Sequence, residues 1–303
     1  MGNAKRVLIH VGYVKTGSTW LQTQIFNNKN LGFALVCDRP LLTHQIIHPP
    51  IFEFNVDVIQ QHINENLRHI NDEKVPVVSH ERLAGSAISG GFDSTIIADR
   101  LFELLPEAKA LIVIREQLSH ILSTYKEYVN QGGVCSLQQF LFPPEGRALP
   151  LFNFSFYEYH KLIEYYHSRW GREKILVLPY ELLVQKPLDF YNTIASFVGA
   201  KNAPSIPSDR VRISKGSFSV SVERQMNRLF YRSNVNPSAP FKISKMKGIV
   251  RVMNRVTPNW LNRLIKIDIQ KQIPLDVMKR YASSNKITES YSNFQLSDFG
   301  YYF

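Results

Sequence analysis

The chain has 303 residues, of which 44% are hydrophobic, and its formal net charge is +11. This length and apolar content suit one large α/β domain with a sizeable core. The two cysteines exclude a disulfide framework and suit a reducing cytosol. The apolar stretch after Arg6 is too short for a signal peptide or a membrane span, so a cytoplasmic protein is expected.

Short apolar runs alternate with longer helical patterns along the first two thirds of the chain. This alternation predicts a mostly parallel sheet with right-handed crossovers and helices on both faces, in a single domain over residues 1–303. The expected strands are 6–12, 33–37, 75–80, 109–114 and 174–179. The expected helices are 18–28, 55–70, 94–105, 117–131 and 155–171.

The first expected strand leads into a loop with the GxxxxG spacing of a P-loop, Gly12-Tyr-Val-Lys-Thr-Gly17. In nucleotide triphosphatases a lysine follows the second glycine and reaches the β- and γ-phosphates. Here Ser18 follows, and Lys15 stands at the crown of the loop, where it can meet the link between a 5′-phosphate and an attached group. Ser18 and Thr19 add hydroxyl groups beside the free N–H groups of the helix start, so we expect an anion cradle.

The fourth expected strand ends directly in Arg115, and Ser123 follows eight residues later on the next expected helix. P-loop enzymes that use a metal usually place an aspartate at the end of a comparable strand, so this arginine argues against a bound magnesium ion. Its fork of donors suits a phosphate, and Ser123 can add a hydroxyl to the same anion. Each such charge-assisted hydrogen bond contributes roughly 1.5–3 kcal/mol, enough to select a 3′-phosphorylated nucleotide.

Several segments, in order along most of the chain, resemble the sulfotransferases that use 3′-phosphoadenosine 5′-phosphosulfate (PAPS). Residues 14–20 look like the family's 5′-phosphosulfate loop, and Arg115 with Ser123 looks like its 3′-phosphate pair. The resemblance implies a three-layer P-loop fold with a basic, helical C-terminal extension. Three further segments resemble family sequences: 177–199 (YE-x-L…P…F-[LV]-G), Lys215-Gly216 (a basic-glycine pair) and 281–301 (the close of many bacterial members).

The resemblance also implies a role for each matching residue. Lys15 would contact the bridging oxygen or the sulfonate and offset the charge that builds on the leaving phosphate. Arg115 and Ser123 would bind the 3′-phosphate. Trp20 and Tyr180 stand in the places of adenine neighbours, although their apolar surroundings also suit core packing. The expected 5′-phosphate ligands are Thr16, Gly17, Ser18 and Thr19, and Lys215 with Gly216 is expected near the 3′-phosphate.

The implied reaction is in-line transfer of a sulfonate from PAPS to a hydroxyl or amine of an acceptor, which releases adenosine 3′,5′-bisphosphate. Such chemistry depends on positioning and electrostatics more than on covalent steps. It requires no metal. The sequence contains no zinc motif, because Cys37 and Cys135 lie far apart and the nine histidines form no H-E-x-x-H.

The proton of the acceptor needs a general base, and the third expected strand ends in candidates, because α/β sheets bind ligands at the carboxyl ends of their strands. Glu81 fits an S-x-E-x-L pattern that resembles many bacterial members, and His80 is its neighbour. His44 and His48 follow the second expected strand. A carboxylate or imidazole tuned near neutral pH suits proton removal, and the histidines equally suit solvated or capping positions.

The last third of the chain, residues 201–303, carries the whole net charge, with 18 Lys plus Arg against 6 acidic residues. We expect it to be mainly helical, with a lid over 201–250. Basic and apolar residues alternate at helical spacing over 242–266. Such a helix suits peripheral contact with an anionic membrane, an acidic acceptor, or packing on the body with a solvated basic face. No nucleic-acid motif accompanies the charge.

Residues 132–154, rich in glycine, proline and aromatic residues, are expected to form a long loop that contacts the acceptor. The aromatic loop and basic tail suit a glycan, a lipid-linked sugar, a lipid or a small phenolic acceptor. A noncatalytic anion-binding or membrane-surface protein would explain the basic tail, but not the loop together with Arg115 and Ser123. A nucleotide kinase would need a lysine after Gly17 and an aspartate for magnesium.

Overall fold

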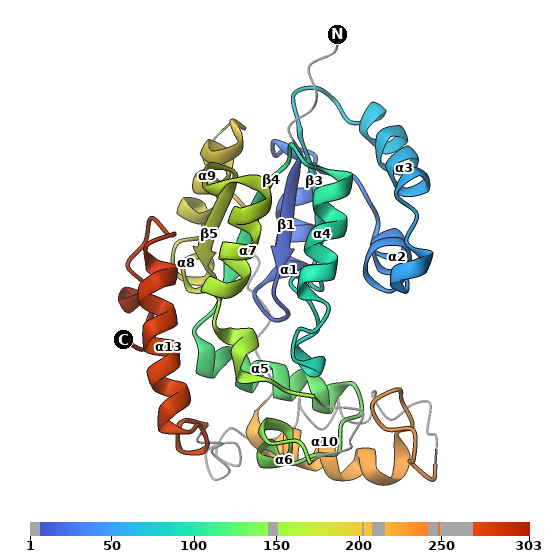
Figure 1. Ribbon diagram of the computed structural model, residues 1–303, viewed down its shortest axis with the longest axis vertical. Helices are drawn as coiled ribbons and strands as arrows, with labels where there is room; N and C mark the ends of the chain where they lie inside the picture. Colours follow the sequence, from blue (N-terminus) through green and yellow to red (C-terminus); the bar gives the residue numbers. More distant parts are fainter. Residues whose placement is uncertain (1–6, 145–150, 202, 208–215, 242–247, 249–268) are drawn as a thin grey trace.

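The computed structural model describes residues 7–144, 151–201, 203–207, 216–241, 248 and 269–303. Its centre is a five-stranded sheet in the order β2-β3-β1-β4-β5, in which every neighbouring pair is parallel (Figure 1). The strands are β1 (Leu8–Gly12), β2 (Phe33–Leu35), β3 (Val75–His80), β4 (Lys109–Ile114) and β5 (Ile175–Pro179).

Helices cover both faces of the sheet, and α4 and α7 lie in front of it in Figure 1. The α-helices are α1 (Ser18–Trp20), α2 (Arg39–Leu41), α3 (Val56–Arg68), α4 (Ser94–Leu104), α5 (Gln117–Asn130), α6 (Leu137–Leu141), α7 (His160–Trp170), α8 (Tyr180–Gln185), α9 (Pro187–Val198), α10 (Ser217–Phe230) and α13 (Leu275–Glu289). The 3-10 and π segments are η1 (Leu21–Phe26), η2 (Leu42–Ile47), η3 (Ile51–Glu53), η4 (Ala87–Ser89), η5 (Phe154–Tyr157), η6 (Arg172–Lys174), η7 (Gln270–Gln272) and η8 (Leu296–Phe299).

Strands β1, β3, β4 and β5 are buried on both faces, which explains why they are apolar runs rather than alternating patterns. On β1, Ile9 and Val11 belong to one core cluster and Leu8 belongs to the other. The first cluster includes α4, α5 and α7, and the second includes η1, α8 and α9. The carboxyl end of β1 points toward α5 (Figure 1), so the P-loop opens onto that helix.

The predicted fold class is confirmed. Both ends of each predicted strand lie within two residues of the ends of an observed strand. The helix expected over 18–28 is α1 continued by the π segment η1. The prediction of a loop over 132–154 was partly wrong, because this segment contains the helix α6. Ser136 and Gln139 form a capping box at the start of this helix.

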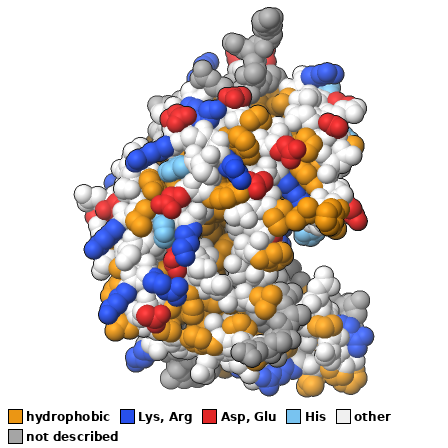
Figure 2. All heavy atoms as spheres, viewed as in Figure 1, with side chains coloured by type: hydrophobic (Ala, Val, Ile, Leu, Met, Phe, Trp, Pro, Cys, Tyr) orange, Lys and Arg blue, Asp and Glu red, His pale blue; other side chains and the backbone are white. Residues whose placement is uncertain are grey.

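In the C-terminal part, α10 packs on α5 and α13 packs on α7. The basic helix expected over 242–266 lies outside the described residues apart from Gly248. Within the described part of the chain, no helix is both long enough and apolar enough to cross a membrane. Figure 2 shows a deep hollow in the right-hand outline, between the part of the body that carries α2 and the part that carries α10.

Candidate active site

The P-loop wraps tightly around its own first helical turn. A Cβ atom on Gly12 would lie 2.4 Å from Ser18 Oγ and 3.2 Å from the Cα atom of Glu81, so only glycine fits there. Gly17 has a φ of +84°, which glycine adopts without strain. The hydroxyl of Thr16 donates to the carbonyl of Tyr13 at 2.7 Å. Ser18 Oγ is buried and has no hydrogen-bond partner among the described residues, which leaves this hydroxyl available for an anion.

Lys15 has a φ of 71°, and among the described residues no other side-chain-bearing residue has a positive φ. The left-handed conformation costs an L-residue about 1–2 kcal/mol, so the surrounding loop must enforce it. The carbonyl oxygen of Lys15 accepts a hydrogen bond from Arg115 Nη1 at 2.9 Å. The ammonium group of Lys15 donates to Glu127 Oε2 at 3.3 Å. The lysine at the crown of the loop is therefore tied to β4 and to α5.

Arg115 follows β4 directly, and the polar face of α5 starts beside it. The Nε atom of Arg115 donates to Ser119 Oγ at 3.2 Å. Ser119, Ser123 and Glu127 are spaced by four residues and share one face of the helix. Ser123 is buried. The guanidinium of Arg115 therefore contacts one end of a short polar stripe that contains Ser123, and the ammonium group of Lys15 contacts the other end.

The two predicted adenine neighbours lie on the α8–η1 side of the sheet. Tyr180 is half-buried, and its ring lies 3.2 Å from the position of a Cβ atom on Gly17. The guanidinium of Arg115 lies 4.9 Å from the centre of the same ring. Trp20 is also half-buried and packs against the core cluster that contains Tyr180's neighbours Leu182 and Leu183. Tyr180 therefore contacts the cradle itself.

The end of β3 carries two of the predicted bases in different environments. His80 is 2% exposed, its Nδ1 accepts from the backbone N–H of Arg82 at 3.0 Å, and its Nε2 lies 3.2 Å from Thr43 Oγ1. Burial lowers the pKa of His80 to about 4, although the neighbouring Glu81 opposes this shift. Glu81 is paired through Oε1 with the guanidinium of Arg39. The imidazole of His80 is thus neutral, and both of its nitrogens have hydrogen-bond partners. The carboxylate of Glu81 is paired with the exposed side chain of Arg39.

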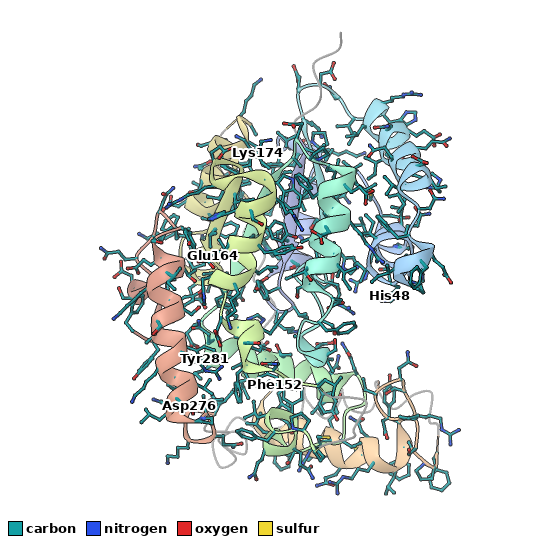
Figure 3. All side chains as sticks on the ribbon, viewed as in Figure 1. His48, Phe152, Glu164, Lys174, Asp276 and Tyr281 are labelled. Carbon is teal, nitrogen blue, oxygen red and sulfur yellow. The ribbon has the colours of Figure 1, made fainter. Side chains whose placement is uncertain are left out.

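The other predicted histidines lie on or beside η2. His44 and His48 are both exposed, and their ring centres are 6.3 Å apart (Figure 3 labels His48). The pKa of His48 is lowered, first by partial burial and then by the charge of Arg82. Thr43 on η2 contacts His80, so this segment borders the end of β3. Lys215 lies outside the described residues, and Gly216 immediately precedes α10.

Comparison with known proteins decides the family. The family model described as the sulfotransferase domain matches residues 5–227, which is most of the chain. The chain belongs to the sulfotransferase family. The resemblance carried by the P-loop, Arg115 and Ser123 is therefore confirmed at the level of the family. Among curated proteins, no sequence matches the chain.

Solved structures of sulfotransferases resemble this one at low sequence identity. A sulfotransferase from Alicyclobacillus acidocaldarius is 17% identical, with a TM-score of 0.51 over 69% of this chain and 87% of that chain. It shares the fold. The sulfotransferase domain from the curacin biosynthetic pathway is 14% identical, with a TM-score of 0.46 over 99% of each chain. A mouse sulfotransferase in complex with PAP is 10% identical, with a TM-score of 0.40 over 98% of this chain and 87% of that chain.

The sulfotransferase also contains a buried hydrogen-bond relay that sequence reasoning missed. His120 Nε2 donates to the carbonyl of Val14 at 2.7 Å, and its Nδ1 lies 2.8 Å from Tyr159 Oη. Tyr159 also donates to the carbonyl of Arg115 at 2.6 Å. Burial lowers the pKa of His120 to about 3, so the imidazole is neutral. The single hydroxyl proton of Tyr159 is therefore shared between two acceptors, and the relay joins the P-loop to the end of β4.

Glu127 and Ser119 contact Lys15 and Arg115, and the sequence analysis did not single them out. Both belong to the polar face of α5, and their four-residue spacing from Ser123 was a usable signal. No group of three or more histidine, cysteine, aspartate or glutamate side chains among the described residues has a geometry that could hold a metal ion.

Proposed function

We propose that this sulfotransferase transfers a sulfonate from PAPS to a hydroxyl or amine of an acceptor by in-line displacement without a metal ion. The observation that carries the proposal is the meeting of Lys15 and Arg115, from two separate motifs, through a hydrogen bond of 2.9 Å. It brings the expected 5′- and 3′-phosphate ligands into one site. A bisphosphorylated nucleotide is the ligand that this pairing suits.

The cradle fits the 5′ end of such a nucleotide. The buried Ser18 hydroxyl has no partner among the described residues, and a phosphate oxygen would supply one. Gly12 and Gly17 leave no room for a Cβ atom, so the loop can fold closely against Ser18, Glu81 and Tyr180. The exposed Thr19 adds a second hydroxyl at the same helical turn. These features support binding of the 5′-phosphate by the residues that the family resemblance predicts.

At the other end of the polar face, Arg115 and Ser123 would bind the 3′-phosphate. The guanidinium already lies over the ring of Tyr180, which would place an adenine close to that tyrosine. An arginine where metal-using P-loop enzymes have an aspartate supports charge neutralisation by side chains. Arg115 is fixed by three contacts, so little side-chain entropy is lost when it binds an anion.

In the transfer step, the acceptor oxygen or nitrogen forms a bond to sulfur while the bond from sulfur to the 5′-phosphate oxygen breaks. The electron pair of that bond stays on the phosphate, and Lys15 would offset the growing negative charge. The acceptor proton passes to a base. In an in-line displacement the attacking atom and the leaving phosphate oxygen lie on opposite sides of the sulfur, so the base must reach the acceptor on the side of the sulfur opposite that oxygen.

We assign this base to Glu81. Its Cα atom would lie 3.2 Å from a Cβ atom on Gly12, which supports a position beside the cradle. His80 is a weaker candidate because both nitrogens are engaged and burial keeps its pKa at about 4. His44 is the alternative, since it is exposed on the segment that borders β3. A carboxylate positioned in this way typically accelerates such a step by about 10²–10⁴-fold.

The acceptor is proposed to be a glycan, a glycolipid or another small molecule. The hollow in Figure 2 is flanked by hydrophobic side chains, and such surfaces suit sugar faces and apolar chains alike. The free, buried cysteines Cys37 and Cys135 support a cytoplasmic location. The basic C-terminal part supports peripheral contact with the inner face of a membrane.

Ligand titration tests the proposed function. The protein is heated with adenosine 3′,5′-bisphosphate, with 5′-AMP, or with ATP and magnesium, and the unfolding temperature is measured. A ligand that binds only the native state raises this temperature, and the rise grows with the logarithm of its concentration relative to its Kd. We expect stabilisation by the bisphosphate and little by the other two. Stabilisation by magnesium-ATP alone would contradict the proposed sulfotransferase activity.

A further inference from the structure

The side chain of Lys15 spans the gap between the P-loop and α5. Its backbone is fixed by the positive φ and by the hydrogen bond from Arg115, so the side chain leaves the loop in a defined direction. It ends at the carboxylate of Glu127, 3.3 Å away. The group expected to contact the reacting end of a nucleotide is thus already occupied by an anion that belongs to the protein.

The carboxylate of Glu127 is itself oriented. Its Oε1 accepts from Asn130 Nδ2 at 3.3 Å and from Gln131 Nε2 at 3.4 Å, which leaves Oε2 for Lys15. Burial alone would raise the pKa of Glu127, but Lys15 and the two amides outweigh burial and hold that pKa below its usual value. The group is therefore a fixed negative charge at neutral pH.

The ion pair is open enough to exchange. The side chains of Lys15 and Glu127 are 38% and 25% exposed, and pairs with this exposure contribute little net stability because water solvates both charges. A nucleotide phosphate carries more negative charge than one carboxylate and offers several acceptor oxygens. An anion of that kind can take the ammonium group from Glu127 without breaking a buried ion pair.

We propose that Glu127 and the 5′ end of a bound nucleotide compete for the ammonium group of Lys15. The inference rests on the proposed function, because it assumes a nucleotide in the P-loop. Glu127 holds Lys15 in the ligand-free enzyme, releases it to the donor, and recovers it when the bisphosphate product leaves. Glu127 is then a positioning residue that lowers nucleotide affinity and favours product release, a step that often limits turnover.

Two substitutions separate the effect of the contact between Glu127 and Lys15 from the effect of the negative charge on Glu127. Glu127→Gln removes the charge, and Glu127→Asp keeps the charge but withdraws it from Lys15 by one methylene group. If direct competition sets the affinity, both variants bind adenosine 3′,5′-bisphosphate about two- to fivefold more tightly than the parent protein, as the loss of a partly exposed ion pair allows. Adenosine 3′-monophosphate, which lacks the 5′ group, is the matched ligand, and its affinity should change less. Calorimetry at fixed ionic strength measures both.

Glu107→Gln is the matched control variant. Glu107 pairs with Lys174 at 2.8 Å. These two residues precede β4 and β5, so they lie at the amino ends of the strands, whereas the P-loop lies at the carboxyl ends. This variant changes the net charge equally and should leave both affinities unchanged. A tighter complex with Glu127→Gln but not with Glu127→Asp would show a field effect without competition and overturn the inference. Weaker binding by both variants would also overturn it. Failure of the parent protein to bind the bisphosphate would instead overturn the proposed function.

Discussion

Arg115 Nη1 donates a hydrogen bond to the carbonyl oxygen of Lys15 at 2.9 Å, although the two residues lie 100 positions apart in the sequence. The same guanidinium donates to Ser119 and lies over the ring of Tyr180. These contacts fix the side chain of Arg115 before any ligand binds. They also support the strained backbone of Lys15, so a change at either residue should affect the other.

Replacing Arg115 by alanine is expected to weaken binding of adenosine 3′,5′-bisphosphate by about 10- to 100-fold. The loss follows from the removal of a charge-assisted hydrogen bond of roughly 1.5–3 kcal/mol. Calorimetric titration measures it. Arg115→Lys keeps the charge but loses the planar fork, so it should recover only part of the affinity. Equal losses for the bisphosphate and for 5′-AMP would contradict the assignment of Arg115 to the 3′-phosphate.

Replacing Lys15 by alanine is expected to abolish sulfonate transfer with a smaller loss of bisphosphate affinity than Arg115→Ala causes. The reason is that Lys15 is assigned to charge that develops during transfer, and such an interaction raises turnover more than binding. Transfer is measured with labelled PAPS and extracts of the source organism, and binding by calorimetry. If Lys15→Ala mainly weakened binding while Arg115→Ala mainly slowed transfer, the two roles would have to be exchanged.

The sheet and the two anion-binding motifs could be predicted because their signals are local. Buried parallel strands are short apolar runs, and Lys15 and Arg115 each follow such a run directly. The helix α6 was missed because glycines and prolines flank it, although Ser136 and Gln139 have capping-box spacing. Capping-box spacing of this kind indicates the start of a helix.

Contacts between distant segments could not be predicted in the same way. The pair Lys15–Glu127 spans 112 positions, and the relay from Val14 through His120 to Tyr159 joins three separate elements. Nothing in the sequence around Tyr159 indicates which carbonyl its hydroxyl reaches. These contacts depend on how α5 and η5–α7 pack on the sheet, which only the folded chain defines.

Replacing Tyr159 by phenylalanine is expected to lower the free energy of unfolding by about 1–3 kcal/mol. The substitution leaves the buried Nδ1 of His120 and the carbonyl of Arg115 without their donor, and unsatisfied buried acceptors carry a cost of this size. Tyr166→Phe is the matched control, because the buried hydroxyl of Tyr166 has no hydrogen-bond partner among the described residues. Urea denaturation compares them, and equal effects would rule out a structural role for the relay.

Stability is expected to fall as the pH is lowered from about 6.5 toward 5. Burial lowers the pKa of His10 and His120 to about 3 and that of His80 to about 4. Below an ordinary histidine pKa of about 6.5, the unfolded chain binds protons that the native protein does not, so acid favours unfolding. Each histidine contributes up to about 1.4 kcal/mol per pH unit. Urea denaturation at several pH values measures this, and a flat profile between pH 6.5 and 5 would contradict it.

Replacing Glu81 by glutamine is expected to slow sulfonate transfer by about 10²–10⁴-fold, since a positioned base accounts for a factor of this size. Bisphosphate affinity should stay within about threefold, because Glu81 is assigned to the acceptor side. Arg39→Ala is the matched control: it removes the partner of Glu81 but keeps the carboxylate, so transfer should persist. Unchanged transfer by Glu81→Gln, together with a loss in His44→Gln, would move the role of base to the histidine on η2.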